Sequence, residues 1–174
     1  MRLFLAFPLP VDIVECVEAM QTRLKDKNLR LPESPHLTMK FLGDVDEEKL
    51  DVLKATLATI KHPTCEVRLG AIGAFPAASK PRVLWVGVEP VDLLMRLHAD
   101  AERALKGMFP PDEKFHPHIT LARVKSDIDA PTVKRIMAIP VEPREFEVDR
   151  LVLFRSVLTG QGPVYTELME VKLG

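Results

Sequence analysis

The four-residue pattern His-x-Thr-x occurs twice in this chain. It reads His-Leu-Thr-Met at residues 36–39 and His-Ile-Thr-Leu at residues 118–121, 82 positions apart (118 − 36). In a β-strand successive side chains alternate between the two faces, so the histidine and threonine of each copy share one face. Two such strands would offer two imidazoles, which is what a reaction with a general acid and a general base needs.

Two facing histidines suit the cleavage of a phosphodiester. One imidazole takes a proton from the attacking oxygen and the other gives a proton to the leaving oxygen, and an ordinary pKa of about 6.5 suits both tasks. In-line attack puts the entering and leaving oxygens on opposite sides of phosphorus. Thr38 and Thr120 are candidate ligands of the phosphate, because a hydroxyl can donate a hydrogen bond to an anion.

Packing and metal binding are the alternatives to this chemistry. A single copy of the pattern is a weak signal, since histidine and threonine also occur in strands for packing, and the matched surroundings of the two copies are what favour a site. Two histidines could hold zinc, but no nearby cysteine or carboxylate completes a recognisable ligand set. We therefore expect no metal and no other cofactor.

The same order of predicted elements leads up to each motif. An apolar strand is predicted at residues 3–7 and another at residues 83–88, and each is followed by apolar residues at helical spacing. A loop with several prolines then leads into each histidine. The offset from strand to motif is 33 residues in the first copy (36 − 3) and 34 in the second (118 − 84), so the two surroundings correspond.

The elements predicted after the motifs also correspond. In each half a short helix follows the motif strand, and a further strand follows that helix. A Gly-Gln-Gly sequence at residues 160–162 separates the last two strands and is typical of a hairpin turn. The predicted ranges are a helix capped by residues 43–46 and running to Ile60, a strand at about 65–72, a helix from Asp129 to Ile136, and strands at about 146–154 and 164–171.

These patterns predict an α+β fold in which the order β-α-β-α-β occurs twice. The pseudo-repeats span about residues 1–75 and 82–174, and a segment rich in Ala, Pro and Gly at residues 73–81 links them. The chain has 174 residues, which is the size of one domain with a substantial core. We therefore predict a single domain over residues 1–174.

Composition and charge exclude several classes of protein. The chain is 47% hydrophobic and 28% charged, as in soluble globular proteins, and its net charge of −1 argues against tight non-specific binding to long nucleic acid. The apolar residues 1–7 end at Pro8 and read as a buried strand rather than a signal peptide, and no apolar run reaches the length of a membrane span. Cys16 and Cys65 show neither metal-ligand spacing nor a disulfide framework, which favours a reduced, cytoplasmic setting.

Six segments of the chain match the pattern of a known family. They are Arg-Leu-Phe-Leu-Ala at 2–6, His-Leu-Thr-Met-Lys-Phe-Leu-Gly at 36–43, Gly-Ala-Phe-Pro at 73–76, Pro-Arg-Val-Leu-Trp-Val-Gly at 81–87, Pro-His-Ile-Thr-Leu-Ala-Arg at 117–123 and Leu-Phe-Arg-Ser at 153–156. On these segments, which span nearly the whole chain, the sequence resembles the 2H phosphoesterase superfamily. Within it, the resemblance is to the RNA 2′,3′-cyclic phosphodiesterases, also called 2′-5′ RNA ligases.

The resemblance implies a bilobal fold with two antiparallel sheets flanked by helices and a pseudo-twofold axis between them. The lobes need not equal the sequence halves, because the first and last strands can share a sheet. The implied reaction is hydrolysis of a terminal 2′,3′-cyclic phosphate on RNA to a 2′-phosphate. In it His36 is the proton donor to the departing 3′ oxygen, and His118 is the proton acceptor that activates water. Reversal with a 5′-hydroxyl RNA as nucleophile would form a 2′-5′ linkage.

Two basic residues near the motifs could also meet the phosphate. Arg123 belongs to the second motif region of the family, and a guanidinium can bind phosphate through two hydrogen bonds. It lies five positions after His118, so strict alternation puts it on the opposite face unless the strand ends or bulges after Leu121. Lys40 has the parity of His36 and could supply positive charge, but a solvated lysine at a strand end fits equally well. The predicted substrate-binding residues are Thr38, Thr120 and Arg123.

Four aromatic residues on or next to the predicted strands leave two interpretations open. They could stack against a base, as aromatic side chains do with single-stranded RNA. They could equally belong to the core. The four are Phe41, Phe75, Trp85 and Tyr165.

The predicted partner is an RNA end that carries a 2′,3′-cyclic phosphate. One alternative keeps the enzyme class and changes the substrate to a small cyclic nucleotide or an ADP-ribose cyclic phosphate. Another alternative is a non-catalytic protein that binds RNA ends on the same fold, and turnover under excess substrate separates it from an enzyme. We expect a monomer and no membrane partner.

Overall fold

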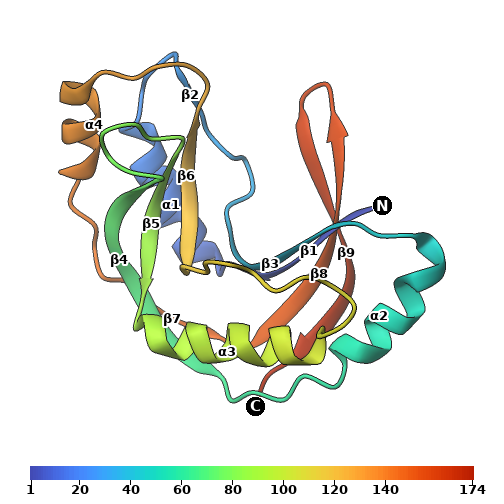
Figure 1. The fold of residues 1–174 in the computed structure, drawn as a ribbon. Coiled ribbons are helices and arrows are strands. Elements are labelled where there is room, and N and C mark those ends of the chain that lie inside the picture. Colours follow the sequence, from blue (N-terminus) through green and yellow to red (C-terminus); the bar gives the residue numbers. More distant parts are fainter.

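The backbone forms one strongly curved antiparallel sheet with four α-helices packed against it (Figure 1). The computed structural model describes all residues from 1 to 174. In chain order the elements are β1 (Arg2–Pro8), α1 (Val11–Thr22), β2 (Leu29–Arg30), β3 (His36–Asp44), a 3₁₀ turn (Glu47–Lys49), α2 (Leu50–Leu57), β4 (Cys65–Phe75), β5 (Val83–Glu89), α3 (Val91–Ala104), β6 (His118–Val124), α4 (Ala130–Met137), β7 (Glu145–Val148), β8 (Arg150–Thr159) and β9 (Gly162–Lys172).

The sheet consists of two lobes that meet at the motif strands. The strand order is β7-β4-β5-β6-β3-β1-β8-β9, with β2 added to β6. We call β7-β4-β5-β6 the first lobe and β3-β1-β8-β9 the second lobe. They are joined through the pair Leu37–Ile119 of β3 and β6. The predicted α+β class is confirmed. The two predicted sheets form one continuous sheet, because β3 and β6 pair with each other near their first residues.

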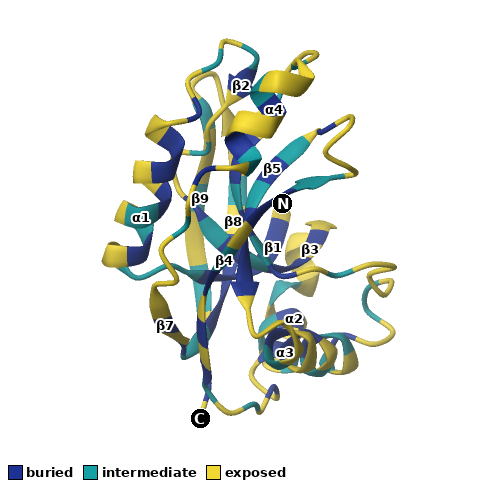
Figure 2. Ribbon diagram, turned by 90° about the vertical axis from the view of Figure 1, so that its left-hand side faces the viewer, coloured by how far each residue is buried: buried dark blue, intermediate teal, exposed yellow.

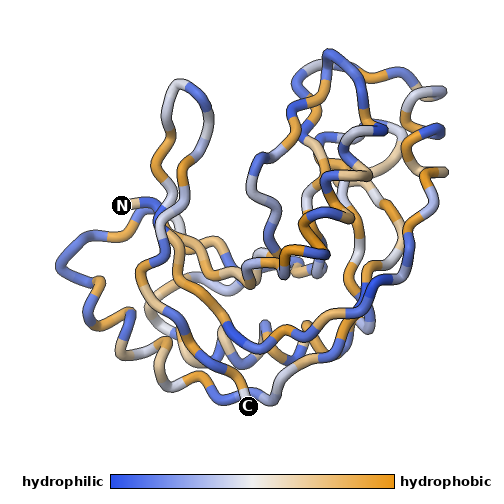
Figure 3. The backbone as a smooth tube through the Cα atoms, turned by 180° about the vertical axis from the view of Figure 1, so that it is seen from behind, coloured by the Kyte–Doolittle hydropathy of each residue, from blue (hydrophilic) through white to orange (hydrophobic).

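Each lobe takes strands from both predicted repeats. β1 pairs with β8 from Arg2–Ser156 to Ala6–Val152, and β4 pairs with β5. The last strand of the first predicted repeat, β4, therefore lies beside the first strand of the second repeat. The C-terminal β8–β9 hairpin extends the lobe that contains β1 and forms one of the two arms visible from behind in Figure 3.

The core lies between the helices and one face of the sheet. A single cluster of 37 buried residues takes side chains from all four helices and includes both Leu37 and Ile119. In Figure 2, α1 turns its buried side toward the sheet and its exposed side outward, as the predicted periodicity of Ile13, Val17 and Met20 requires. None of the helices is long and apolar enough to span a membrane.

Some predicted boundaries differ from the structure. The strand predicted at 146–154 is two strands, because β7 leaves β4 at Val148 and β8 begins at Arg150, where it pairs with β9. From Val152 onward β8 also pairs with β1. The helix predicted to reach Ile60 ends at Leu57, and the side chain of Asp46 makes no capping hydrogen bond. Asp129 does cap α4, since its carboxylate accepts a hydrogen bond from the Thr132 backbone N–H at 2.7 Å.

Candidate active site

The two motifs lie side by side at the junction of the lobes. Leu37 of β3 is paired with Ile119 of β6 in antiparallel register, and both are fully buried. Continuing this register by one residue in each direction sets His36 opposite Thr120 and Thr38 opposite His118. All four side chains point to the face opposite the core and are half-buried. We call the sheet face that carries these four residues the histidine face.

The register determines how far apart the two imidazoles are. Directly opposed residues of an antiparallel pair have Cβ atoms about 5 Å apart, and diagonal neighbours are about 7–8 Å apart. His36 and His118 are diagonal neighbours, and so are Thr38 and Thr120. A phosphate group between the histidines would therefore have an imidazole on each of two sides and a hydroxyl on each of the other two.

Both imidazoles are held by the same hydrogen bond. Nδ1 of His36 donates to the carbonyl of Ser34 at 2.9 Å, and Nδ1 of His118 donates to the carbonyl of His116 at 2.7 Å. A carbonyl can only accept, so each Nδ1 carries the proton and each Nε2 is the atom that takes or gives a proton. The buried prolines Pro35 and Pro117 precede the two histidines and shape both loops in the same way.

Burial makes both histidines easier to deprotonate. It lowers the pKa of His36 and of His118 below the ordinary value of 6.5, because an apolar environment disfavours the imidazolium. The carbonyl hydrogen bonds oppose this change, and the positive charge of Arg123 lowers both pKa values further. Protonated His118 also lowers the pKa of His36, which is consistent with their position as neighbours.

Matching β-bulges in the two motif strands decide where the basic residues point. Opposite β1, Met39 is an extra residue between Thr38 and Lys40, and opposite β5, Leu121 is an extra residue between Thr120 and Ala122. A bulge reverses the alternation beyond it. Beyond each bulge, therefore, residues an odd number of positions after the histidine lie on its face, and residues an even number after it lie on the opposite face.

Arg123 consequently lies on the histidine face. It is exposed, and its charge acts on both histidines. The sequence allowed Arg123 to reach the site only if the strand ended or bulged after Leu121. The bulge lies at Leu121 itself and reverses the face of Arg123 in the same way. The corresponding residue of the first motif is Phe41, which is 61% exposed.

Lys40 turns away from the histidine face for the same reason. Its side chain is 1% exposed, and its Nζ contacts Glu102 Oε1 at 2.5 Å, Asp112 Oδ1 at 3.1 Å and the carbonyl of Pro110 at 3.0 Å. The predicted roles of Lys40, a positive charge in the site or a solvated strand-end lysine, were both wrong. Its ammonium instead ties β3 to α3 and to the loop that leads into His118.

The two carboxylates that contact Lys40, together with His98, have the composition of a metal site. The ligand atoms of His98, Glu102 and Asp112 lie within 4.8 Å of one another. Nε2 of His98 is 2.9 Å from Asp112 Oδ2. Since the Lys40 ammonium contacts both carboxylates, it already supplies the positive charge that a cation would bring. His98 is thus buried in a polar cluster.

Gln21 connects the motifs from the other side and was not predicted. It is buried in α1, and its Nε2 donates to the carbonyls of Pro32 and Leu121, both at 3.1 Å. Leu121 is the bulged residue of β6, and a bulge leaves a backbone group without its ladder partner. The Gln21 amide thus gives the Leu121 carbonyl a hydrogen-bond partner. Through the Pro32 carbonyl it also holds the loop that precedes His36. Nothing in the sequence distinguishes Gln21 from a solvated helix residue.

Aromatic rings flank each histidine on its own lobe. His36 lies 5.0 Å from the ring of Phe4 and 5.3 Å, edge-on, from Tyr165. His118 lies 5.0 Å, edge-on, from Phe75, which in turn lies 4.9 Å from Trp85. These rings are partly or largely buried, so they exclude water from the imidazoles, which agrees with the lowered pKa values.

The two remaining histidines lie off the motif strands. Nδ1 of His62 is 2.7 Å from Asp100 Oδ2, away from both motifs. His116 is exposed, lies 4.8 Å from the ring of Trp85 and offers its carbonyl to His118. Neither of them belongs to the pair of motif histidines on β3 and β6.

A separate surface hollow does not suit an anionic ligand. It measures about 730 Å³ and lies beside β4 and β7. Its lining includes four glutamates and one arginine, which together repel a phosphate. The glutamates are Glu66, Glu89, Glu145 and Glu147, and the arginine is Arg68.

Comparison with known proteins agrees with this geometry. The family model described as the 2′-5′ RNA ligase superfamily matches residues 8–159, which contain both motifs and both bulges. This chain belongs to that superfamily. Members of the 2′-5′ RNA ligase superfamily with similar sequences include proteins named RNA 2′,3′-cyclic phosphodiesterase. One, from Aeropyrum pernix, is 38% identical over 145 residues, covering 80% of this chain and 82% of that protein.

One further relative and one solved structure match over nearly their whole length. The RNA 2′,3′-cyclic phosphodiesterase of Methanocaldococcus jannaschii is 35% identical over 98% of this chain and 99% of that protein. The crystal structure of TT0787 from Thermus thermophilus superposes with a TM-score of 0.82 at 31% identity, covering 99% of this chain and 97% of the other. The two-lobed arrangement is therefore shared with a solved structure.

Proposed function

We propose that this protein is a metal-independent enzyme that hydrolyses a terminal 2′,3′-cyclic phosphate on RNA to a 2′-phosphate. The observation that carries the proposal is the matched pair of half-buried histidines, each with Nδ1 bonded to a carbonyl and Nε2 left for proton transfer. The names of the similar proteins support the same substrate.

The proposed reaction is a single in-line displacement at phosphorus. Nε2 of His118 takes a proton from water, and the water oxygen forms a bond to phosphorus. The bond from phosphorus to the 3′ oxygen breaks, and Nε2 of His36 gives its proton to that oxygen. The hydroxyls of Thr38 and Thr120 and the guanidinium of Arg123 stabilise the charge on the phosphoryl oxygens.

The choice of acid and base rests on the resemblance to the family. The surroundings of the two histidines are nearly symmetric, so the geometry by itself supports either assignment. After one turnover His118 carries a proton and His36 has lost one, so solvent restores both. The reverse reaction, with the 5′-hydroxyl of a second RNA as nucleophile, would form a 2′-5′ linkage.

We also propose that the protein acts as a cytoplasmic monomer built from two pseudo-repeats. Both histidines, both threonines and Arg123 come from one chain, so no second copy is needed to complete the histidine face. Cys16 and Cys65 are free, which suits a reducing compartment. The strand order around β3 and β6 supports repeats at about residues 1–75 and 82–174.

The test is an assay with a short RNA that ends in a 2′,3′-cyclic phosphate, in excess over the enzyme and with excess EDTA. We expect multiple turnovers to a 2′-phosphate, resolved from the 3′-phosphate, at a rate that EDTA does not change. Turnover of cyclic mononucleotides alone would favour the small-nucleotide alternative. Binding of the RNA without turnover would favour the non-catalytic RNA-end binder.

The pH dependence of kcat/KM is expected to be bell-shaped with its maximum below pH 6.5. The rate rises as pH rises through the pKa of the base, which must be neutral, and falls as pH rises through the pKa of the acid, which must be protonated. Burial lowers both pKa values in the free enzyme, so the whole bell moves to lower pH. A bound phosphate anion favours the imidazolium forms, so the kcat profile should peak at higher pH than the kcat/KM profile.

The measurement is a series of initial rates below and above KM from about pH 4.5 to 8.5, a range that brackets the ordinary imidazole pKa. Stability across the range is checked by preincubation at each pH and assay at a common pH. A kcat/KM maximum above about pH 7.5 would contradict the lowered pKa values of a two-histidine mechanism.

A further inference from the structure

Three arginines near the histidine face have no acidic partner. Arg2, Arg30 and Arg123 are exposed, and none of them forms an ion pair with a carboxylate. The arginines that do form such pairs lie elsewhere and are Arg68, Arg96, Arg103, Arg144 and Arg150. In a chain of net charge −1, unpaired positive charge gathered at one place attracts an anion.

Arg30 extends from the first lobe toward the second. Its strand, β2, pairs with β6 so that Arg30 lies directly opposite Arg123. Its guanidinium reaches the β8–β9 hairpin, since a Cβ added to Gly162 would lie 3.4 Å from Nη2 of Arg30. Two like charges opposite each other destabilise an antiparallel pair, and a phosphate bound at each guanidinium would offset that repulsion.

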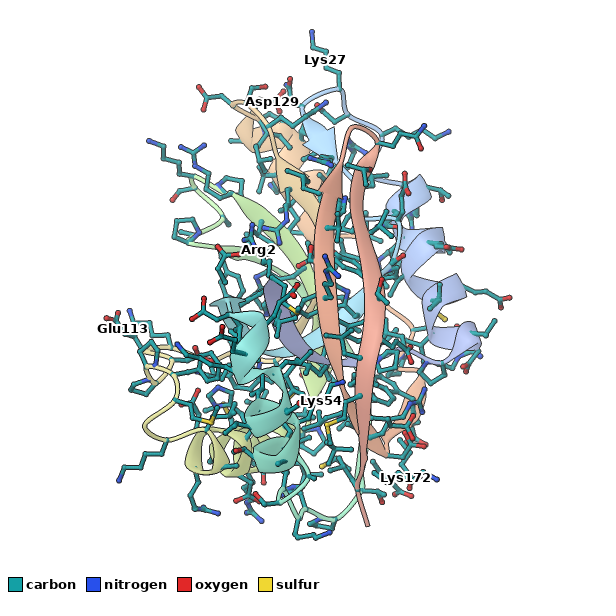
Figure 4. The ribbon with its side chains drawn as sticks, turned by 90° about the vertical axis from the view of Figure 1, so that its right-hand side faces the viewer. Arg2, Lys27, Lys54, Glu113, Asp129 and Lys172 are labelled. Carbon is teal, nitrogen blue, oxygen red and sulfur yellow. The ribbon has the colours of Figure 1, made fainter.

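Arg2 approaches the same place from the second lobe. It begins β1, where Figure 4 labels it, and pairs with Ser156 of the hairpin. All three arginines act on the hydroxyl of Tyr165. Burial raises the pKa of this hydroxyl, and the positive charges of the three arginines oppose that rise. Tyr165 also pairs with Ser156 and lies edge-on to His36 at 5.3 Å, so the positive charges of the three arginines act on a position next to the histidines.

We propose that Arg30 binds the phosphodiester that immediately precedes the terminal nucleotide, and thereby makes the enzyme prefer an oligonucleotide end to a cyclic mononucleotide. This inference rests on the proposed function and specifies its substrate class. The terminal phosphate already has two histidines, two threonines and Arg123. A cyclic mononucleotide has no second phosphate, so it cannot use Arg30.

The position of Arg30 along β6 supports the second phosphate rather than the first. β2 and β3 both pair with β6, β3 at Ile119 and β2 at Arg123 and Val124. Arg30 therefore lies about four residues further along β6 than the point where the motifs pair. At about 3.4 Å per residue this is about 14 Å of strand, and from there the Arg30 guanidinium extends to Gly162 of the β8–β9 hairpin. An RNA chain that leaves the histidines along β6 toward the hairpin would bring its next phosphate to Arg30.

The experiment compares three substrates with the wild type and with Arg30→Gln. The substrates are a 2′,3′-cyclic mononucleotide, a dinucleotide with a terminal cyclic phosphate and an ordinary internal phosphodiester, and the same dinucleotide with an uncharged methylphosphonate at that internal linkage. The Arg30 side chain makes no intramolecular hydrogen bond, so the variant should fold normally. Arg96→Gln on the exposed face of α3 is the matched control for loss of one arginine charge.

For the ordinary dinucleotide, Arg30→Gln should lower kcat/KM about tenfold, mainly through a higher KM, and should weaken its dependence on salt. For the mononucleotide and the methylphosphonate the variant should stay within about twofold of the wild type, as Arg96→Gln should for all three substrates. An equal loss on all three substrates, or no loss on any, would overturn the inference while leaving the proposed function standing. A wild type that turns over none of the three would overturn both.

Discussion

Replacing either motif histidine with alanine is expected to reduce turnover of an RNA 2′,3′-cyclic phosphate by about 10²- to 10⁴-fold, which is the usual contribution of a positioned acid or base. His36 and His118 lie on opposite sides of the phosphate position and act at opposite ends of the same displacement. The loss should appear in kcat as well as in kcat/KM, because proton transfer stabilises the transition state and not the bound substrate.

The two histidine variants should also differ in their residual pH profiles. His118→Ala removes the group that must be neutral, so the rate should no longer rise with pH on the acidic side of the profile. His36→Ala removes the group that must be protonated, so the fall on the alkaline side should disappear. The opposite pattern would exchange the two roles, and a near-normal rate in either variant would exclude the acid–base scheme.

His62→Ala is the matched control for these variants. His62 is also hydrogen-bonded and largely buried, but its partner is Asp100 rather than a motif residue. Its removal should leave turnover unchanged even if it lowers stability somewhat. Thermal unfolding of all three variants separates a loss of chemistry from a loss of fold.

Lys40→Met is expected to lower the free energy of unfolding by about 3 kcal/mol, the low end of the range for removing one partner of a buried ion pair. The change takes away the ammonium that contacts both Glu102 and Asp112, leaving two carboxylates close to each other beside the His98 imidazole. The low end applies because these carboxylates are 20% and 31% exposed and can recover part of their hydration. Equilibrium unfolding in urea measures the difference.

Lys49→Met is the matched control for the lysine variant. Lys49 contacts Asp46 at 3.0 Å, but both side chains are mostly exposed, so its loss should change the free energy of unfolding by less than about 0.5 kcal/mol. Adding Glu102→Gln and Asp112→Asn to Lys40→Met should restore part of the stability, because it removes the unpaired charges. A loss below about 1 kcal/mol for Lys40→Met would show that the cluster does not hold β3 to α3.

Local sequence patterns were enough to locate the motif strands, their helices and the two histidines. Alternation and helical periodicity depend on neighbours within one element, so residues 36–44 and 118–124 could be recognised as strands and their histidines placed on one face. The repeated order of elements then indicated that the two histidines belong to one site rather than to two unrelated strands. The strand β2, with two residues, is too short to carry any such pattern.

The sequence by itself determined which residue types the site contains, because the motif and its spacing are local properties. Only the tertiary structure decided how those residues combine. The register of β3 against β6 set each histidine opposite a threonine. The bulge at Leu121 placed Arg123 on the histidine face, and the bulge at Met39 turned Lys40 to the opposite, buried face. The pairing of β2 with β6 placed Arg30 opposite Arg123. Register, bulges and strand order depend on pairing between distant segments, and no local pattern records that pairing.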